Sequence, residues 1–276
     1  VPDVVALIDG QGAGPLQVFS AEPLSVSSRT FNQAPAGTFG QSLDGVTATC
    51  GLQSGESGVL MQLREDPTAR SNIGVVNLWR RAAEVEVALY DGSSLPIASF
   101  TRTVPALTTV QINRPFRDIG GRSDIASGYA VISVLSGQDV YAYASVVDNG
   151  TDDPTTIPMK RGPGATLSWV AAAAATSGAH GSLWRTDLSL LNRSGGLATA
   201  EIRYRGDDGA TGTLTLAIGS GEQHLLEDAV SALGSSGGGW IEIVSDQAIH
   251  VLSRTFNLGD EGSYGQSLDG IATSAT

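Results

Sequence analysis

Few side chains in this sequence have the types and the spacing that catalysis or metal binding requires. Three histidines are present, His180, His224 and His250, and no two of them have the spacing of a zinc site. We expect them to be ordinary surface or edge residues of strands. The single cysteine, Cys50, excludes an intrachain disulfide and a cysteine-based zinc cluster. We therefore expect no enzymatic activity, no catalytic residues and no cofactor.

Two short strings match motifs of known chemistry, but their context favours ordinary turns. Residues 234–238 (Gly-Ser-Ser-Gly-Gly) have the G-x-S-x-G pattern of a nucleophile elbow, which needs a strand before the serine and a helix after it. Here a strand is expected to follow at Trp240, so a flexible glycine turn is the better interpretation. Residues 205–207 (Arg-Gly-Asp) form an integrin-type tripeptide, and they lie in an expected hairpin turn where such residues are common.

The densest group of oxygen ligands is the loop that contains Asp148, Asp152 and Asp153. A calcium ion takes six or more oxygens, and a short acidic loop can supply them. The loop lacks a distal bidentate glutamate, and its Asn149-Gly150 dipeptide is itself a hairpin signal. Calcium is therefore only a weak candidate here, and we expect no metal.

The turn Trp79-Arg80-Arg81 is the strongest candidate for an interaction site. An aromatic side chain with two arginines on a loop has the composition of an interface anchor. The corresponding residues of a later repeat, 194–196, read Ser-Gly-Gly, which is a plain turn. The alternative is that Trp79 folds back over the edge of its own domain and the arginines are solvated.

Tyrosines suggest a carbohydrate-binding surface as an alternative. Tyr129, Tyr141 and Tyr143 could supply a strip of exposed aromatic rings. Tyr141 and Tyr143 share one strand face, however, and we expect Trp240 to replace Tyr129 in a core. A simple planar strip is therefore disfavoured.

The elements that must position these residues are defined by an internal repeat. Residues 28–32 (Ser-Arg-Thr-Phe-Asn) recur at 253–257, and residues 40–45 (Gly-Gln-Ser-Leu-Asp-Gly) recur at 265–270. Both pairs are 225 residues apart, and the ungapped match covers residues 1–48 with 18 identities. A match of this length indicates a duplicated structural unit.

A weaker middle copy lies between these two. Residues 72–77 match residues 187–192, and residues 138–148 match residues 247–257. The offset of 225 is thus about twice the length of a sandwich domain of roughly 110 residues. We predict three units, which are the C-terminal half of a repeat at 1–50 and complete repeats at 51–160 and 165–276.

The pattern within each unit predicts an all-β fold. Short alternating runs between clusters of turn residues are common, 35 glycines are present, and sustained helical spacing is nearly absent. One helical turn is expected within residues 227–233, and turns are expected at 194–196 and 206–209. Regularly spaced short strands in units of this length indicate tandem immunoglobulin-like β-sandwich domains, with the first one incomplete. In the last unit the strands are expected near 168–175, 186–192, 198–204, 211–218, 223–226, 240–245, 249–257 and 265–272.

The charge disfavours two classes of partner. The net charge is −12 with a pI near 4.5, whereas binding to nucleic acid or anionic lipid needs a basic face. No apolar run is long enough to span a membrane, and no signal peptide is recognisable at the N-terminus. The chain starts Val-Pro-Asp, so we expect a processed form or a fragment.

The repeat motifs resemble those of tandem immunoglobulin-like or fibronectin-like β-sandwich repeats of secreted or surface bacterial proteins. That resemblance implies a sandwich fold and an extracytoplasmic location, whether periplasmic, on the cell surface or secreted. The segments that carry the resemblance are 184–192, 254–257 and 262–266 in the last copy, with 145–149, 153–155 and 157–158 in the middle copy.

The half repeat leads to the partner hypothesis. Residues 1–48 alone would leave one sheet face and several strand edges open, and such edges invite pairing. We expect completion by a cleaved fragment, a neighbouring chain or a partner subunit. The expected function is a non-catalytic structural or interaction protein, acting as scaffold or accessory subunit of a larger, soluble or membrane-bound assembly. The alternatives are a carbohydrate-binding or adhesin module, or the non-catalytic tail of a secreted hydrolase.

Overall fold

The computed structural model describes residues 3–12, 14–34 and 37–273 of the chain. It confirms the all-β prediction, with 60% strand and 6% helix in curled, sandwich-like sheets. Each α-helix in the described part is a single short segment of four residues, as the near absence of helical spacing in the sequence predicts. No helix among these residues is long and apolar enough to cross a membrane.

The middle part of the chain forms two sheets that face each other. One sheet has the strand order β10-β9-β4-β7, and the other has the order β11-β3-β8-β5-β6. The strands are β3 (Ser57–Glu65), β4 (Ala69–Asn77), β5 (Ala83–Asp91), β6 (Pro96–Val104), β7 (Thr109–Asn113), β8 (Ile125–Ser136), β9 (Val140–Asp148), β10 (Pro154–Pro158) and β11 (Lys160–Arg161). The helix α2 (Pro115–Asp118) joins β7 to β8, and its Phe116 is fully buried. Alternating residues of both sheets, such as Ile73, Val87 and Ile132, have no exposed surface and form the core between them.

The last part of the chain is built around one long strand, β17 (Gly237–Gly259). Its first half pairs with β12 and β14, and its second half pairs with β13 and β18, so it belongs to both layers. The other elements are β12 (Ala165–Ser177), η2 (Ala179–Gly181), β13 (Leu183–Leu191), β14 (Ala198–Gly206), β15 (Thr211–Ile218), β16 (Gln223–Leu226), α3 (Ala229–Ala232), β18 (Gly262–Asp269) and β19 (Ile271–Ala272).

The strand predictions for this part are close to what is observed. The expected helical turn is α3, and the expected turns at 194–196 and 206–209 join β13 to β14 and β14 to β15. The expectation of separate strands at 240–245 and 249–257 is wrong, because β17 continues through both. Residues 246–248 remain extended, and the hydroxyl of Ser245 accepts a hydrogen bond from the Gln247 amide at 3.3 Å.

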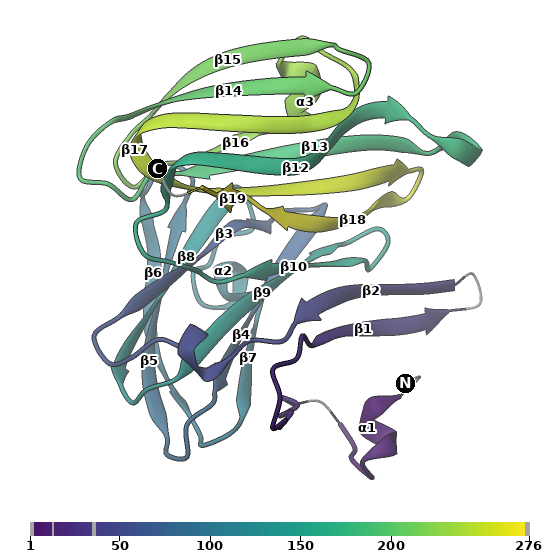
Figure 1. Cartoon of the computed structure of the whole chain (residues 1–276). Coiled ribbons are helices and arrows are strands. Elements are labelled where there is room, and N and C mark those ends of the chain that lie inside the picture. Colours follow the sequence, from purple (N-terminus) through teal and green to yellow (C-terminus); the bar gives the residue numbers. More distant parts are fainter. Residues whose placement is uncertain (1–2, 13, 35–36, 274–276) are drawn as a thin grey trace.

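The N-terminal part contains α1 (Val4–Leu7), a long irregular segment, the hairpin of β1 (Ser27–Ala34) and β2 (Gly37–Asp44), and η1 (Ala48–Cys50). The hairpin is a separate two-stranded sheet. Figure 1 shows β2 next to β10, with α1 at the periphery of the molecule. Strand β10 contacts both β2 and β18, so the first and last copies of the repeated hairpin both lie against the middle repeat.

Candidate functional site

The N-terminal half repeat and the end of the last repeat share a helical turn and a hairpin at equivalent positions, although residues 15–26 are irregular where the equivalent part of β17 is a strand. Helix α1 lies 225 positions before α3, and both end with the same hydrogen bonds. The amide of Gly10 donates to the carbonyl of Val5 at 2.8 Å, and the amide of Ser235 donates to the carbonyl of Val230 at 3.1 Å. The sequence of each segment is therefore sufficient to specify the same helical turn in two different surroundings.

The hairpins also match in register. Arg29 pairs with Ser42 across the first hairpin, and Arg254 pairs with Ser267 across the last one. Each arginine lies over the phenylalanine two residues later, with its guanidinium carbon 5.1 Å from the ring centre in the first hairpin and 4.7 Å in the last. A glycine faces each phenylalanine, which leaves room for the ring. The repeated arginine and phenylalanine thus have a structural role within the hairpin.

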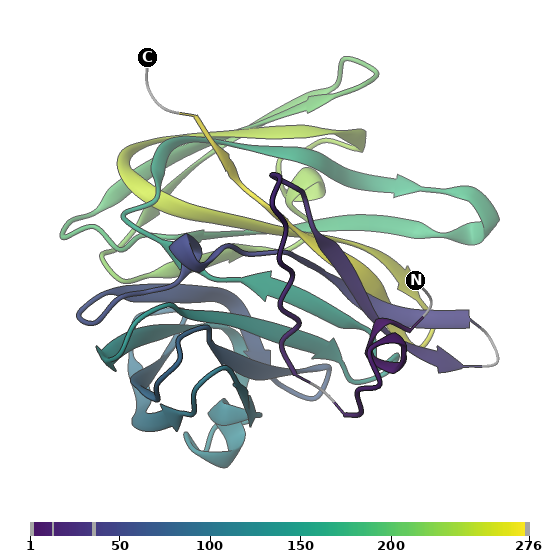
Figure 2. The same ribbon diagram turned by 60° about the horizontal axis from the view of Figure 1, so that its bottom comes forward.

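The two copies differ sharply in what covers their apolar side chains. In the last repeat these side chains lie in the core, whereas in the half repeat they are exposed to solvent. The pairs at an offset of 225, with exposed fractions, are Leu16 (45%) and Ile241 (0%), Val18 (57%) and Ile243 (1%), Leu24 (54%) and Ile249 (1%), and Val26 (36%) and Val251 (3%). Figure 2 shows the irregular segment that precedes β1 running across the outside of the molecule.

The strand edge of the half repeat is open as well. In the last repeat the second half of β17 has β18 on one side and β13 on the other. In the middle repeat β9 likewise lies between β10 and β4. Among the described residues β1 pairs only with β2, so the place of β13 is not filled. An extended strand edge next to exposed apolar side chains is a surface for strand addition.

The hairpin nevertheless has a fixed place on the middle repeat. The side-chain oxygen of Gln41 accepts hydrogen bonds from the hydroxyls of Ser145 at 3.1 Å and Thr156 at 2.9 Å. Both donors belong to the edge of the sheet formed by β9 and β10. The contact holds β2 against the chain and leaves the opposite side of the hairpin, the edge of β1, facing outward.

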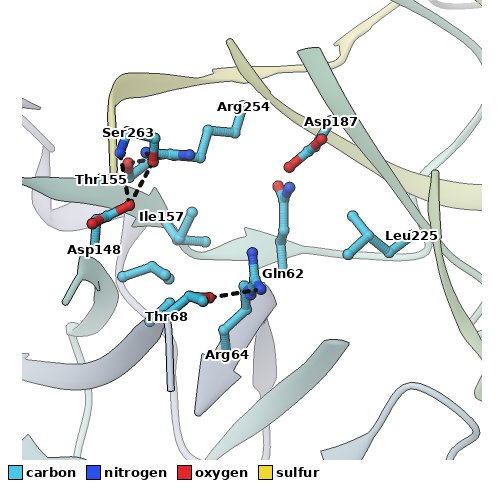
Figure 3. A pocket seen from close by; sticks show the side chains of 12 residues that line it. Gln62, Arg64, Thr68, Asp148, Thr155, Ile157, Asp187, Leu225, Arg254 and Ser263 are labelled. Atoms are coloured by element: carbon cyan, nitrogen blue, oxygen red, sulfur yellow. Dashed lines mark hydrogen bonds between the residues drawn. The ribbon is translucent and has the colours of Figure 1, made fainter. Parts of the chain in front are cut away.

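A second polar site lies where the two complete repeats meet (Figure 3). It surrounds a cavity of about 40 Å³, which has room for a few water molecules but not for an organic ligand. Its polar lining includes Gln62, Asp148, Thr155, Asp187 and Arg254. The Nε of Arg254 donates to the hydroxyl of Thr155 at 2.9 Å, which joins β17 to β10.

The charged groups of this junction have shifted pKa values. Burial raises the pKa of Asp187, against the opposing effects of the Asp228 amide and the charge of Arg254. Burial also raises the pKa of Asp153, although the Gly265 amide and Arg254 act in the other direction. Burial lowers the pKa of Arg254, and the neighbouring carboxylates offset part of that effect. These charged groups come from both repeats, and Arg254 of the last repeat donates to Thr155 of the middle one, so the arrangement joins the two repeats.

The calcium interpretation of the 148–153 loop is not supported. One oxygen of Asp148 accepts from the amides of Gly150 and Thr151 at 2.9 and 3.1 Å, and the other accepts from Ser263. Asp152 pairs with Arg70, and Asp153 accepts from the Gly265 amide at 2.9 Å. The three carboxylates point to different donors, and the described residues contain no cluster of acidic, histidine or cysteine side chains that could hold a metal.

Comparisons with known proteins leave the family open. No family model matches the chain, and no curated protein matches it. The solved structures that match include that of Thermotoga maritima 1070, at 13% identity over 41% of this chain and 98% of that one, with a TM-score of 0.35. Another is a glycosyl hydrolase family 2 member from Bacteroides cellulosilyticus DSM 14838, at 11% identity and a TM-score of 0.19. This chain spans 28% of that hydrolase, which in turn matches 78% of this chain.

The turn with Trp79, Arg80 and Arg81 lies between β4 and β5. Trp79 is half-buried, and its ring lies against Gly137, where an added Cβ would come within 3.6 Å of it. The Arg81 guanidinium lies 5.7 Å from the centre of the Trp79 ring, and both arginines are exposed. These contacts are all within the middle repeat, so a role for this turn in binding a partner stays a prediction.

The aromatic strip proposed for carbohydrate binding is not formed. Tyr129 is only 4% exposed, stacks on Tyr90 at 4.9 Å, and donates from its hydroxyl to the carbonyl of Gly221 at 2.9 Å. It lies in the contact between the two complete repeats. Tyr141 and Tyr143 are half-buried on β9, and an added Cβ at Gly74 would meet the ring of Tyr143 at 2.5 Å.

The histidines and the two short motifs have structural surroundings. His250 is 4% exposed, so the expectation of a surface or edge residue is wrong for it, whereas His224 is half-buried and the side chain of His180 lies outside the described residues. Residues 234–238 lead from α3 into β17 and are not followed by a helix, as expected for a turn. The turn at 205–207 is fixed by the Asp207 amide, which donates to the Gly238 carbonyl at 2.9 Å.

Several junction residues could not be recognised in the sequence. Gln223 accepts from the Gln62 amide at 2.9 Å and donates to the Gly128 carbonyl at 3.0 Å, across the two repeats. Asp187 stands in the repeated motif, but its counterpart Asn72 suggested nothing about charge pairing. Asp187 could have been identified by comparing the residue pairs that face each other in the two copies, which are Asp187 with Arg254 and Asn72 with Ser145. That comparison requires knowledge of the strand register.

Proposed function

We propose that the chain is a non-catalytic structural or interaction protein, a row of immunoglobulin-like β-sandwich repeats that serves as scaffold or accessory subunit of a larger assembly. The repeat motifs, which resemble those of secreted or surface bacterial proteins, support an extracytoplasmic location. In this proposal the two complete repeats form a rigid body, and the N-terminal half repeat receives a protein partner.

One observation carries the proposal. The apolar side chains of the half repeat are exposed at the same positions where the last repeat buries them, and the edge of β1 is open where β17 is paired. Full burial of an exposed side chain of this size contributes about 1.5–3 kcal/mol, and these four are 36–57% exposed, so covering each contributes about half of that. Covering Leu16, Val18, Leu24 and Val26 is therefore a large driving force for association.

The test is affinity capture from extracts of the source organism, compared quantitatively between variants. The double substitution Val18→Asp and Leu24→Asp places charges on the exposed apolar face and is expected to abolish capture of the partner. Leu197→Asp is the matched control, since Leu197 is 62% exposed on a loop of the last repeat. Equal capture by the double variant and by the control would reject the half repeat as the binding surface.

A further inference from the structure

We propose that the strand which completes the half repeat is of the β13 type and carries a carboxylate opposite Arg29. This inference rests on the proposed function, in which β1 accepts a strand. It adds the direction, the register and the charge of the incoming segment.

The register follows from the last repeat. Strand β13 runs antiparallel to the second half of β17, with Asp187 opposite Arg254. Because the two hairpins match position by position, Arg29 takes the place of Arg254, and the incoming strand presents the counterpart of Asp187 to it. Leu190 lies three residues after Asp187 and pairs with Val251, which corresponds to the exposed Val26. The incoming strand would therefore place an apolar residue opposite Val26.

The charge follows from comparing the two complete repeats. In the middle repeat Asn72 stands at the position of Asp187, and it pairs with Ser145, which stands at the position of Arg254. Both of these oppositely charged residues are therefore replaced together by neutral residues. In the last repeat Asp187 and Arg254 influence each other's pKa through their charges, while Arg254 donates its hydrogen bonds to Thr155 and Ser263. The half repeat has the arginine, as the last repeat does. We therefore infer that its partner strand carries an acidic residue at the position of Asp187.

The surroundings of Arg29 leave it able to form this pair. Its guanidinium donates to the hydroxyl and the carbonyl of Thr38, at 3.0 and 3.2 Å, and neither acceptor is charged. Among the described residues Arg29 has no ion pair within 4 Å, and it is exposed. The carboxyl group of Asp153 is near enough for the charge of Arg29 to offset a small part of the burial-induced rise in its pKa, and that carboxylate already accepts from the Gly265 amide.

A second copy of this chain is a poor source for the strand. Both edges of β13 are occupied, by β17 and β16, and both edges of β4 are occupied, by β9 and β7. Donation from a second copy would therefore require opening one of its own sheets. The occupant is a strand from a different polypeptide segment that has the alternating apolar residues of β13.

The probe is a fluorescein-labelled peptide with the sequence of residues 182–193, added to the intact chain and followed by fluorescence anisotropy. Two further peptides are compared with it, one with Asp187→Asn and one with the sequence of residues 68–78, which has Asn72 in the place of Asp187. Hydrogen exchange of the amides of residues 27–34 locates the bound peptide on β1.

We expect the unmodified peptide to bind with protection of residues 27–34, and the Asp187→Asn peptide to bind about fivefold more weakly, as for an attraction between opposite charges at a partly exposed site. With the chain variant Arg29→Ser the two peptides should bind equally. The peptide substitution leaves the chain unaltered, so the comparison does not depend on the folding of the variant.

Each of the other outcomes rejects a specific part of this inference. Binding on β1 with equal affinity for all three peptides rejects the carboxylate and leaves the strand-accepting surface intact. No protection of residues 27–34 at saturating peptide rejects both this inference and the strand-accepting role of β1. Concentration-dependent dimerisation of the chain that protects residues 27–34 identifies a second copy as the occupant and rejects an outside strand.

Discussion

Ser263 donates both its backbone amide and its hydroxyl to the same carboxylate oxygen of Asp148, at 2.9 and 2.7 Å. The two residues belong to different repeats, and the other oxygen of Asp148 closes its own loop through Gly150 and Thr151. Although burial opposes ionisation, these hydrogen bonds prevail and lower the pKa of Asp148. One carboxylate therefore shapes a hairpin and fixes the next repeat against it.

Replacing Asp148 by alanine should loosen the junction. Four hydrogen bonds to a charged acceptor are lost, so we expect the free energy of unfolding in urea to fall by about 2–3 kcal/mol. The control is Asp152→Asn, which removes an exposed ion pair with Arg70, keeps a residue that tolerates the positive φ of this position, and should cost less than about 1 kcal/mol. Equal losses in the two variants would show that Asp148 does not hold the repeats together.

The exposure difference between the copies predicts different costs for matched core substitutions. Ile243→Ala creates a cavity in the last repeat and should lower the free energy of unfolding by about 3 kcal/mol. Val18→Ala, at the equivalent position of the half repeat, should change it by less than about 0.5 kcal/mol in the unbound chain. A large effect of Val18→Ala, measured by the same urea titration, would mean that the half repeat buries this residue in solution.

The buried His250 predicts a loss of stability in mild acid. Desolvation, aided by the charges of Lys160 and Arg193, lowers the pKa of His250 to about 4. Its pKa in the unfolded chain is near 6.5, so the unfolded state binds more protons between these values, and stability falls as the pH falls through this window.

Between pH 7 and pH 4.5 this one group should account for about 2 kcal/mol of the lost stability. To measure that contribution, the free energy of unfolding in urea is determined at both pH values for His250→Gln and for the unmodified chain. The variant should lose about 2 kcal/mol less between pH 7 and pH 4.5. The same substitution at the half-buried His224 serves as the control for replacing a histidine of this repeat. If His250→Gln retains the full pH dependence, the histidine is charged or exposed in the folded protein.

The glycine opposite Phe256 is expected to tolerate no side chain. A Cβ at Gly265 would lie 2.5 Å from Phe256 Cβ and 2.7 Å from the carbonyl oxygen of Thr255. Gly265→Ala should therefore lower the thermal stability of the last repeat by about 1–3 kcal/mol. Gly195→Ala, which meets nothing within 4 Å, should have no such effect, and similar melting curves for the two variants would contradict the packing described for this hairpin.

Local features of this protein could be predicted from the sequence because they depend on neighbouring residues. The segment Glu227 to Leu233 was expected to contain a helical turn and does, and the turns around Ser194 and Asp207 are where turn residues occur. The match of residues 1–48 to the end of the last repeat was also evident from the sequence alone. What sequence could not provide were contacts between repeats, such as the burial of Tyr129 against Gly221 or the use of Asp148 by Ser263. These depend on how two folded units meet, and no local pattern encodes that.

The matching hairpins have a consequence for how the chain reaches its folded state. During synthesis the hairpin at 27–44 precedes β13, and β13 precedes the second half of β17 that becomes its partner. Strand β13 therefore meets a competing edge, with an arginine in the right place, before its own partner exists. Unpaired strand edges and repeated units are common sources of misassembly. A partner that occupies β1 early would leave β13 free to pair with the second half of β17.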